Sequence, residues 1–142
     1  MKHFMNQKDM HEMLEKVRPD HESYRTKVWC IISDDSDMGK FALESLSIFD
    51  NLFCYCGVSE HYLVMVIMSH MNISNIQEKI VIPIKNIRNY ENQRGILPGQ
   101  RLVRICFDNT ELHLSLQVRN PFTSHIPNQK QNVAELCHAL AI

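Results

Sequence analysis

The segment from Leu102 to Val118 reads LVRICFDNTELHLSLQV, and its pattern decides the fold. The three polar residues Asp108-Asn109-Thr110 interrupt it and suit a tight turn. The segment therefore predicts a β-hairpin with strands at 102–107 and 111–118. The second strand alternates, which predicts one buried face and one wet face: Leu112, Leu114, Leu116 and Val118 against His113, Ser115, Gln117 and Arg119.

More strands are predicted upstream of this hairpin. The apolar runs Leu52–Val58 and Tyr62–Met68 are separated by a polar link of hairpin length, 59–61, and the second run is apolar enough to be central. In the run 80–84 the isoleucines share one face, and Pro83 marks an edge strand or a strand end. A further short strand is expected at 86–90. Residues 25–32 form the first strand, with apolar side chains on both faces.

Three helices complete the expected elements. The first, at 1–18, carries an apolar stripe and is ended by Pro19. A second is expected at 38–49, after the acidic run 33–37, which suits helix capping. The last, at 128–141, begins at Asn128. The stripes of the first and last helices are Met10, Met13, Leu14 and Val17, and Val133, Leu136, Cys137 and Leu140.

Composition limits the classes of protein to consider. With 142 residues and 44% apolar content, the chain predicts one domain, residues 1–142, with barrel strands at 25–118. A net charge of −1 provides no global field for nucleic acid. The five cysteines lie in strand-like or helical runs and no secretory signal is recognisable, so we expect reduced thiols and a cytoplasmic protein. No cofactor is suggested.

The element order resembles the pleckstrin-homology-like superfold, in which about seven antiparallel strands are closed by a C-terminal helix. The stretch Ile80-Val81-Ile82-Pro83-Ile84-Lys85-Asn86-Ile87, followed by the 102–118 hairpin, resembles a signature of bacterial pleckstrin-homology-like and GRAM-type domains. The resemblance covers about the last ninety residues and implies an α+β, mainly β, barrel that serves as a binding scaffold. Phosphoinositide-binding members carry several basic residues near the first hairpin loop, where this chain has Lys40 alone among acidic residues.

Two segments are candidate contact surfaces for a protein partner or a second copy of the chain. Residues 94–101 are predicted to form a loop with an apolar tip between glycines, flanked by two arginines, and its alternative role is to cover the mouth of the barrel. The first helix either binds a partner or docks on its own barrel. The partner-binding candidates are Arg94, Ile96, Leu97 and Arg101 in the loop, and Met10, Met13 and Leu14 in the helix.

Five of the fifteen basic residues fall within twenty positions: Lys85, Arg88, Arg94, Arg101 and Arg104. If they share a face, they predict a site for a phosphate ligand or an anionic membrane surface, and otherwise a solvated barrel face. The segment 85–104 has one aromatic residue, Tyr90, and a single aromatic ring is not enough for base stacking on nucleic acid.

Catalytic and metal-binding patterns are weak. Cys54 and Cys56 share a strand face, and His61 or Cys106 would have to complete a zinc site, so paired core cysteines are favoured. The sequence therefore predicts a non-catalytic module that works through protein contacts, with self-association as one form of it. An alternative is a cone-shaped α+β protein, a weak enzyme or small-molecule binder, whose pocket would use Tyr55, Tyr62 and His113.

Overall fold

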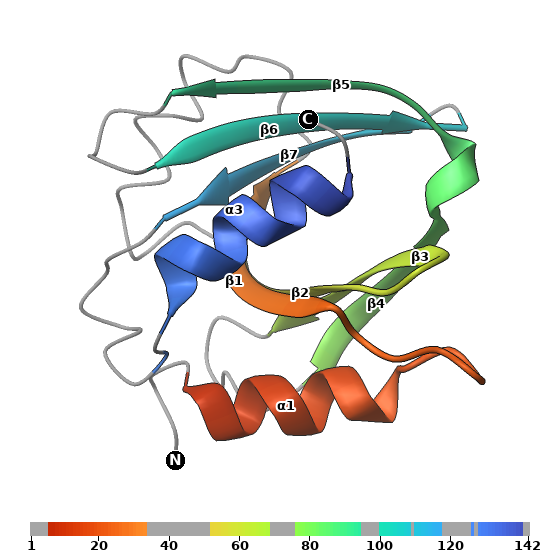
Figure 1. The fold of residues 1–142 in the computed structure, drawn as a ribbon, viewed down its shortest axis with the longest axis vertical. Helices are drawn as coiled ribbons and strands as arrows, with labels where there is room; N and C mark the ends of the chain where they lie inside the picture. The colour runs from red at the N-terminus through yellow and green to blue at the C-terminus, as the bar shows by residue number, and fades with distance from the viewer. Residues whose placement is uncertain are drawn as a thin grey trace.

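The computed structural model describes residues 6–33, 52–68, 76–94, 100–108, 110–117, 126 and 128–140 (Figure 1). Within these ranges the chain forms an antiparallel sheet whose seven strands follow the order β4-β3-β2-β1-β7-β6-β5. The strands are β1 (Thr26–Ser33), β2 (Leu52–Val58), β3 (Tyr62–Met68), β4 (Ile76–Pro83), β5 (Ile87–Arg94), β6 (Arg101–Phe107) and β7 (Thr110–Leu116). The predicted mainly β class is confirmed.

The sheet curls into a half-barrel with one helix on each side (Figure 1). Helix α3 (Gln129–Ala139) fills the concave side, and helix α1 (Gln7–Lys16) lies across the convex side. A short 3-10 helix, η1 (Ile84–Asn86), turns the chain from β4 into β5. The helical insertion predicted at 38–49 lies outside the described residues.

The C-terminal helix closes the half-barrel as the apolar stripe predicted. Val133, Leu136, Cys137 and Leu140 are buried in a cluster with side chains from β1, β2, β3, β6 and β7. Burial of about four such side chains is a large favourable contribution, since each contributes roughly 1.5–3 kcal/mol relative to an exposed position. The cap differs from the expectation: Asn128 has left-handed backbone geometry, with φ of 63°, and its side chain makes no capping hydrogen bond.

Helix α1 docks on the convex face of its own sheet. It starts at Asn6, whose side chain accepts a hydrogen bond from the Asp9 N–H at 2.9 Å, an ordinary N-cap. Met10, Met13 and Leu14 are buried in a second cluster with Trp29 and Tyr55, among others. Of the two roles that the sequence left open, packing against the barrel is therefore the one these side chains fulfil.

Strand β1 separates the two clusters and both of its faces are covered, as predicted. Val28, Cys30 and Ile32 point into the concave cluster, while Trp29 and Ile31 point into the convex one. Strands β2 and β3 also have the predicted bounds and pair antiparallel across the 59–61 hairpin.

Strands β4 and β5 are longer than the sequence predicted. β4 begins at Ile76, because the polar residues Glu78 and Lys79 still pair with β3. β5 continues to Arg94, which pairs directly with Arg101, the first residue of β6. These two arginines therefore belong to strands and not to the loop that the sequence predicted. Ile84 belongs to η1 and not to a strand.

The polar face of β7 is buried, and the prediction of a wet face was wrong. His113, Ser115 and Gln117 are each at most 1% exposed. Ser115 Oγ accepts hydrogen bonds from Gln100 Nε2 at 2.7 Å and from Gln117 Nε2 at 3.3 Å. Alternation in the sequence predicts a strand and shows which of its faces is polar. It does not distinguish polar side chains that are buried and hydrogen-bonded to one another from polar side chains in contact with solvent.

Candidate functional site

The outer face of β5, β6 and β7 carries an ion cluster centred on Arg104. Arg104 lies opposite Glu91 of β5, and its guanidinium reaches Glu91 Oε1 at 2.5 Å and Glu111 Oε1 of β7 at 2.7 Å. The hydrogen bond from Arg104 lowers the pKa of the Glu111 carboxyl below its ordinary value. Because two carboxylates already neutralise Arg104, this side chain is not available as a cation for an external anion.

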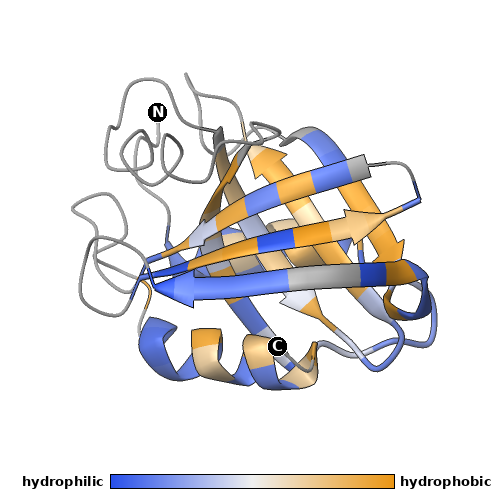
Figure 2. Ribbon diagram, turned by 90° about the horizontal axis from the view of Figure 1, so that it is seen from above, coloured by the Kyte–Doolittle hydropathy of each residue, from blue (hydrophilic) through white to orange (hydrophobic). Residues whose placement is uncertain are grey.

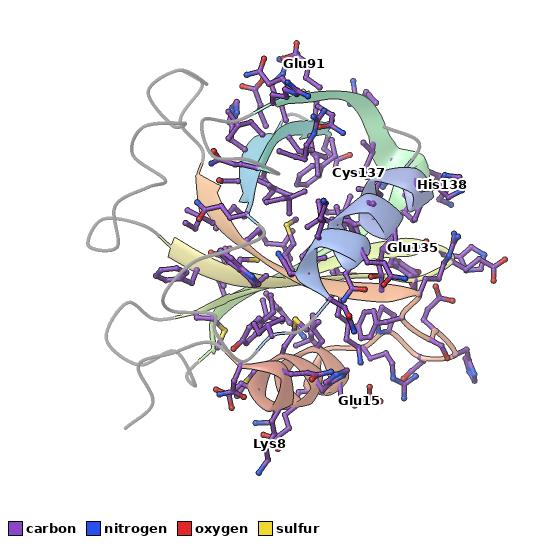
Figure 3. All side chains as sticks on the ribbon, turned by 60° about the vertical axis from the view of Figure 1, so that its left-hand side comes forward. Lys8, Glu15, Glu91, Glu135, Cys137 and His138 are labelled. Carbon is purple, nitrogen blue, oxygen red and sulfur yellow. The ribbon has the colours of Figure 1, made fainter. Side chains whose placement is uncertain are left out.

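On the other face of β5, beside α3, lies a polar strip formed by Asn92, Arg94, Arg101 and Cys137, which we call the β5 strip. Arg101 Nε donates to Asn92 Oδ1 at 2.7 Å, and Asn92 Nδ2 donates to Cys137 Sγ at 3.6 Å. Figure 3 shows Cys137 on α3 and, on the outer face of β5, Glu91 pointing away from the helix. Arg94 is exposed and has no ion-pair partner in the described part of the chain.

The five basic residues predicted as a patch do not form one. Lys85 on η1 and Arg88 at the start of β5 are exposed, whereas Arg94 ends β5 and Arg101 lies opposite it at the start of β6. At about 3.3 Å per residue, Arg88 and Arg94 are separated by roughly 20 Å. The candidate anion-binding residues Lys85, Arg88 and Arg104 thus have different surroundings, and the loop-tip residues Ile96 and Leu97 lie outside the described residues.

Glu22, Ser59 and His61 are the residue types of a hydrolase triad, but they are not arranged as one. Ser59 Oγ donates to Glu22 Oε1 at 2.7 Å, and His61 Nδ1 lies 3.0 Å from Glu22 Oε2. Both side chains contact the carboxylate, so the histidine is not placed to take the serine proton. The cluster fastens the β2–β3 hairpin to the segment that precedes β1.

The thiols of the concave cluster are buried and unreactive. Cys30, Cys54 and Cys56 are buried free cysteines, and Cys30 pairs directly with Cys54 across β1 and β2. A hydrogen bond with Cys54 and burial raise the pKa of Cys30, and burial raises that of Cys56. These thiols are core residues, as the sequence favoured, and within the described ranges no three His, Cys, Asp or Glu side chains gather as metal ligands would.

Two features of the site escaped prediction from sequence. The β5 strip depends on Asn92, which was expected to follow the strand, and on Cys137, which was assigned only to the core stripe. A run of four polar residues, 91–94, follows the predicted strand directly, but polar residues are equally typical of loops. Tyr55 and Tyr62 pack on the convex side and His113 is buried on β7, so they do not line a common pocket inside the barrel.

The fold is similar to solved structures, although no family model matches the sequence and no curated protein matches it. The hSac2 domain from human phosphoinositide phosphatase Sac2 has a TM-score of 0.55 and 13% identity, over 93% of this chain and 78% of that one. The C-terminal domain of an unknown protein from Leishmania infantum has a TM-score of 0.48 and 10% identity, over 96% and 94%.

At 13% identity the likeness to the hSac2 domain concerns the fold alone. Neither of the described α-helices, of which α3 is the longer at eleven residues, could cross a bilayer. The seven antiparallel strands and the helix that closes the concave side agree with the element order expected from the sequence. The chain shares its curled half-barrel fold with the hSac2 domain, which supports a pleckstrin-homology-like fold.

Proposed function

We propose that this protein is a non-catalytic, cytoplasmic binding module that recognises a partner protein through strand β5. The observation that carries the proposal is the position of β5 at the end of the strand order, next to α3. The motif at 80–87, which forms the end of β4, η1 and the first residue of β5, supports a relation to bacterial pleckstrin-homology-like and GRAM-type domains.

An edge strand presents backbone N–H and C=O groups that have no partner on one side. In the described part of the chain β5 pairs with β6 alone, over most of its eight residues. An extended peptide that adds a strand there gains main-chain hydrogen bonds, and side-chain contacts then give specificity. The edge is not apolar, since Figure 2 shows β5 as largely hydrophilic. Such polarity suits a reversible partner better than a permanent one.

The β5 strip indicates the chemistry of the partner. Arg94 and Arg101 lie directly opposite each other at the end of β5 and the start of β6, and no carboxylate pairs with them in the described ranges. Two adjacent guanidinium groups favour a carboxylate on the peptide, which Arg binds with two parallel hydrogen bonds. The proposed ligand is therefore an extended segment that carries an acidic residue near the Arg94 end.

A selection from a library of random linear peptides with the full chain tests this proposal. We expect acidic, extended peptides to be enriched, and the backbone amide signals of β5 to shift in NMR spectra when such a peptide is added. Arg94→Glu should weaken binding by about tenfold or more, because it replaces attraction by repulsion. Lys85→Glu makes the same change of charge at an exposed site beyond the other end of β5 and should have little effect.

The proposal fails if no peptide is enriched, if the shifted amides lie outside β5, or if Lys85→Glu weakens binding as much as Arg94→Glu. Sedimentation velocity over a range of concentrations tests the self-association form. A dimer that Arg94→Glu dissociates would identify a second copy of the chain as the partner.

A further inference from the structure

A groove of about 250 Å³ lies between α1 and the start of α3, over the first residues of β1. It is separate from the β5 strip and was not indicated by the sequence. Its walls include His11 from α1, Tyr24, Arg25 and Lys27 around the start of β1, and Asn128 and Asn132 from α3. These described wall residues include two permanent cations and no carboxylate.

Lys27 is held in position at one wall. Its Nζ lies 2.5 Å from His11 Nδ1 and 5.7 Å from the centroid of the Tyr24 ring. Burial, and the positive charge of Lys27, lower the pKa of His11 below its ordinary value, so at neutral pH the imidazole is neutral and Nδ1 accepts from the ammonium. The two further N–H donors of an ammonium remain for another acceptor.

Arg25 and the start of α3 add positive character on the other side. Arg25 has one carboxylate near it, Glu135 of α3 at 3.6 Å, and both side chains are about half exposed, so this pair is weak and can rearrange. Asn128 lines the groove but does not cap the helix with its side chain, and the first-turn amides of an eleven-residue helix favour negative charge.

The acidic groups nearest the groove are few. Glu15 acts on His11 from the next turn of α1, and Glu135 meets Arg25. Figure 3 shows Glu15 on α1 and Glu135 on α3 as separate side chains. Neither residue lines the groove. The local balance therefore favours an anion, although the whole chain carries a net charge of −1.

We propose that this groove binds the phosphate monoester group of a small phosphorylated molecule. A phosphate monoester offers nearly two negative charges and three acceptor oxygens, which match Lys27, Arg25 and the start of α3. The volume exceeds that of a phosphate group but falls below the usual range for larger ligands. The organic part of the ligand would lie against Met10 and the Tyr24 ring, which also line the groove.

Titration of the isotopically labelled full chain with glucose 6-phosphate, and separately with inorganic phosphate, tests this inference. We expect amide shifts at residues 25–27 and 129–132, and a rise in the pKa of His11 as the anion binds. Lys27→Gln should weaken glucose 6-phosphate binding about tenfold, and Arg25→Gln should do so independently. Arg88→Gln removes one charge from an exposed site on β5 and should leave the affinity unchanged.

If the spectra do not change at about 10 mM glucose 6-phosphate and do not change at about 10 mM inorganic phosphate, the proposal is overturned. A specific site of this kind should bind more tightly than that. Equal losses in Lys27→Gln and Arg88→Gln would overturn it too, since they would indicate attraction by general charge. Amide spectra of each variant show whether it is folded. Arg25 is exposed and Lys27 is partly buried, so we expect both variants to fold.

A lipid headgroup could supply the same phosphate chemistry, so the source is tested separately. Phosphatidylcholine vesicles with and without phosphatidylinositol 4-phosphate are sedimented with the full chain. Cosedimentation that Lys27→Gln abolishes supports the groove with a headgroup as its ligand, whereas soluble binding without cosedimentation supports a free phosphorylated molecule. Cosedimentation that persists in Lys27→Gln, without soluble binding, counts against the groove.

Discussion

Glu22 shows how one carboxylate can organise a turn. It accepts hydrogen bonds from Ser59 Oγ at 2.7 Å and from the His61 backbone N–H at 3.0 Å, and it pairs with His61 Nδ1. The hydrogen bond from His61, followed by that from Ser59, lowers the pKa of Glu22, and the bond to Glu22 raises the pKa of His61. Two groups distant in sequence are thus coupled across the tip of the β2–β3 hairpin.

The first prediction concerns the pH dependence of this contact. The pKa of His61 is raised in the folded chain. Its contribution to the stability of the fold is therefore complete at pH values below its ordinary pKa of 6.5, and it is lost as the pH rises through the raised pKa. The contribution of Glu22 to stability is complete at pH values above its ordinary pKa of 4.5, and it is lost as the pH falls through the lowered pKa. We expect the Glu22–His61 pair to stabilise the fold most between these two ordinary values.

Urea unfolding of the native chain and of Glu22→Gln measures this contribution. The difference in the free energy of unfolding should be larger at about pH 5.5 than at about pH 8.5. The NMR titration of His61 should move toward 6.5 in the variant. A difference that does not change with pH, together with an unshifted His61, would contradict the role assigned to the pair.

The second prediction concerns Gly57 in β2, which lies beneath an aromatic ring. A Cβ added to Gly57 would come within 2.7 Å of Cδ1 and 2.8 Å of Cε1 of Tyr24. The ring cannot swing away freely, because the Tyr24 hydroxyl donates to the Leu14 carbonyl at 2.8 Å. Gly57→Ala should lower the free energy of unfolding by roughly 1–3 kcal/mol, as overpacking does.

A double-mutant cycle with Tyr24→Ala checks that interpretation. Removing the ring makes room for the methyl group, so Gly57→Ala should cost much less in that background. If the cost is the same with and without the ring, contact with Tyr24 is not its cause.

Among the elements, the joint between β1 and β7 depends on a side chain from α3. Within the described residues these strands pair at three positions, Ile31↔Ser115, Ile32↔Leu114 and Ser33↔His113. Beyond them, the Gln129 amide takes the place of the next backbone partner. Its Nε2 donates to the carbonyls of Trp29 and Gln117, each at 2.9 Å, and its Oε1 accepts from the Trp29 N–H at 3.3 Å.

The third prediction follows from this bridge. Gln129→Met keeps the length of the side chain but leaves three backbone groups without their partner, two of them on buried Trp29. The loss should be on the order of 2–4 kcal/mol, since an unsatisfied buried group costs about 1–3 kcal/mol and the site relaxes in part. Lys130→Met is the control on the exposed side of the same turn. Urea unfolding measures both, and equal effects would contradict the bridge.

The elements also show what sequence can and cannot predict. Periodicity identified α3, β2 and β3 with nearly the observed bounds, because each has strong apolar contrast. It also identified α1, which spans Gln7–Lys16 inside the expected range 1–18. It missed the polar ends of β4 and β5, where pairing with a neighbouring strand sustains residues that alone resemble a loop. The buried polar face of β7 depends on Gln100, which is distant in sequence, so no local pattern could reveal it.

The candidate sites were harder to predict than the fold. Arg94 and Arg101 could be singled out from sequence, but their alignment on neighbouring strands is a matter of register. The groove needs Arg25 and Lys27 to meet His11 and Asn128, and the last two are 117 positions apart in the sequence. Such convergence comes from packing between helices and sheet, which composition and spacing do not encode.

At the level of the whole molecule, two half-sheets share one core. β4, β3, β2 and β1 form one half and β7, β6 and β5 the other, and α3 contributes Leu136 to the concave cluster that contains residues of both. Because β1 and β7 share three pairs in the part of the chain that the structure describes, the halves depend on this shared core and on Gln129. They should therefore unfold together and not one after the other.

The last prediction tests this cooperativity with Trp29, the only tryptophan of the chain, which is buried beside the joint. Its fluorescence reports on the joint and far-ultraviolet circular dichroism reports on the whole sheet, so the two urea transitions should coincide. Leu136→Ala should lower both midpoints equally, at a cost of about 2–5 kcal/mol, because it opens a cavity at the centre of the shared core. If the fluorescence transition came first, the joint would open while the half-sheets persisted, and α3 would be a lid on two separate units and not the centre of one.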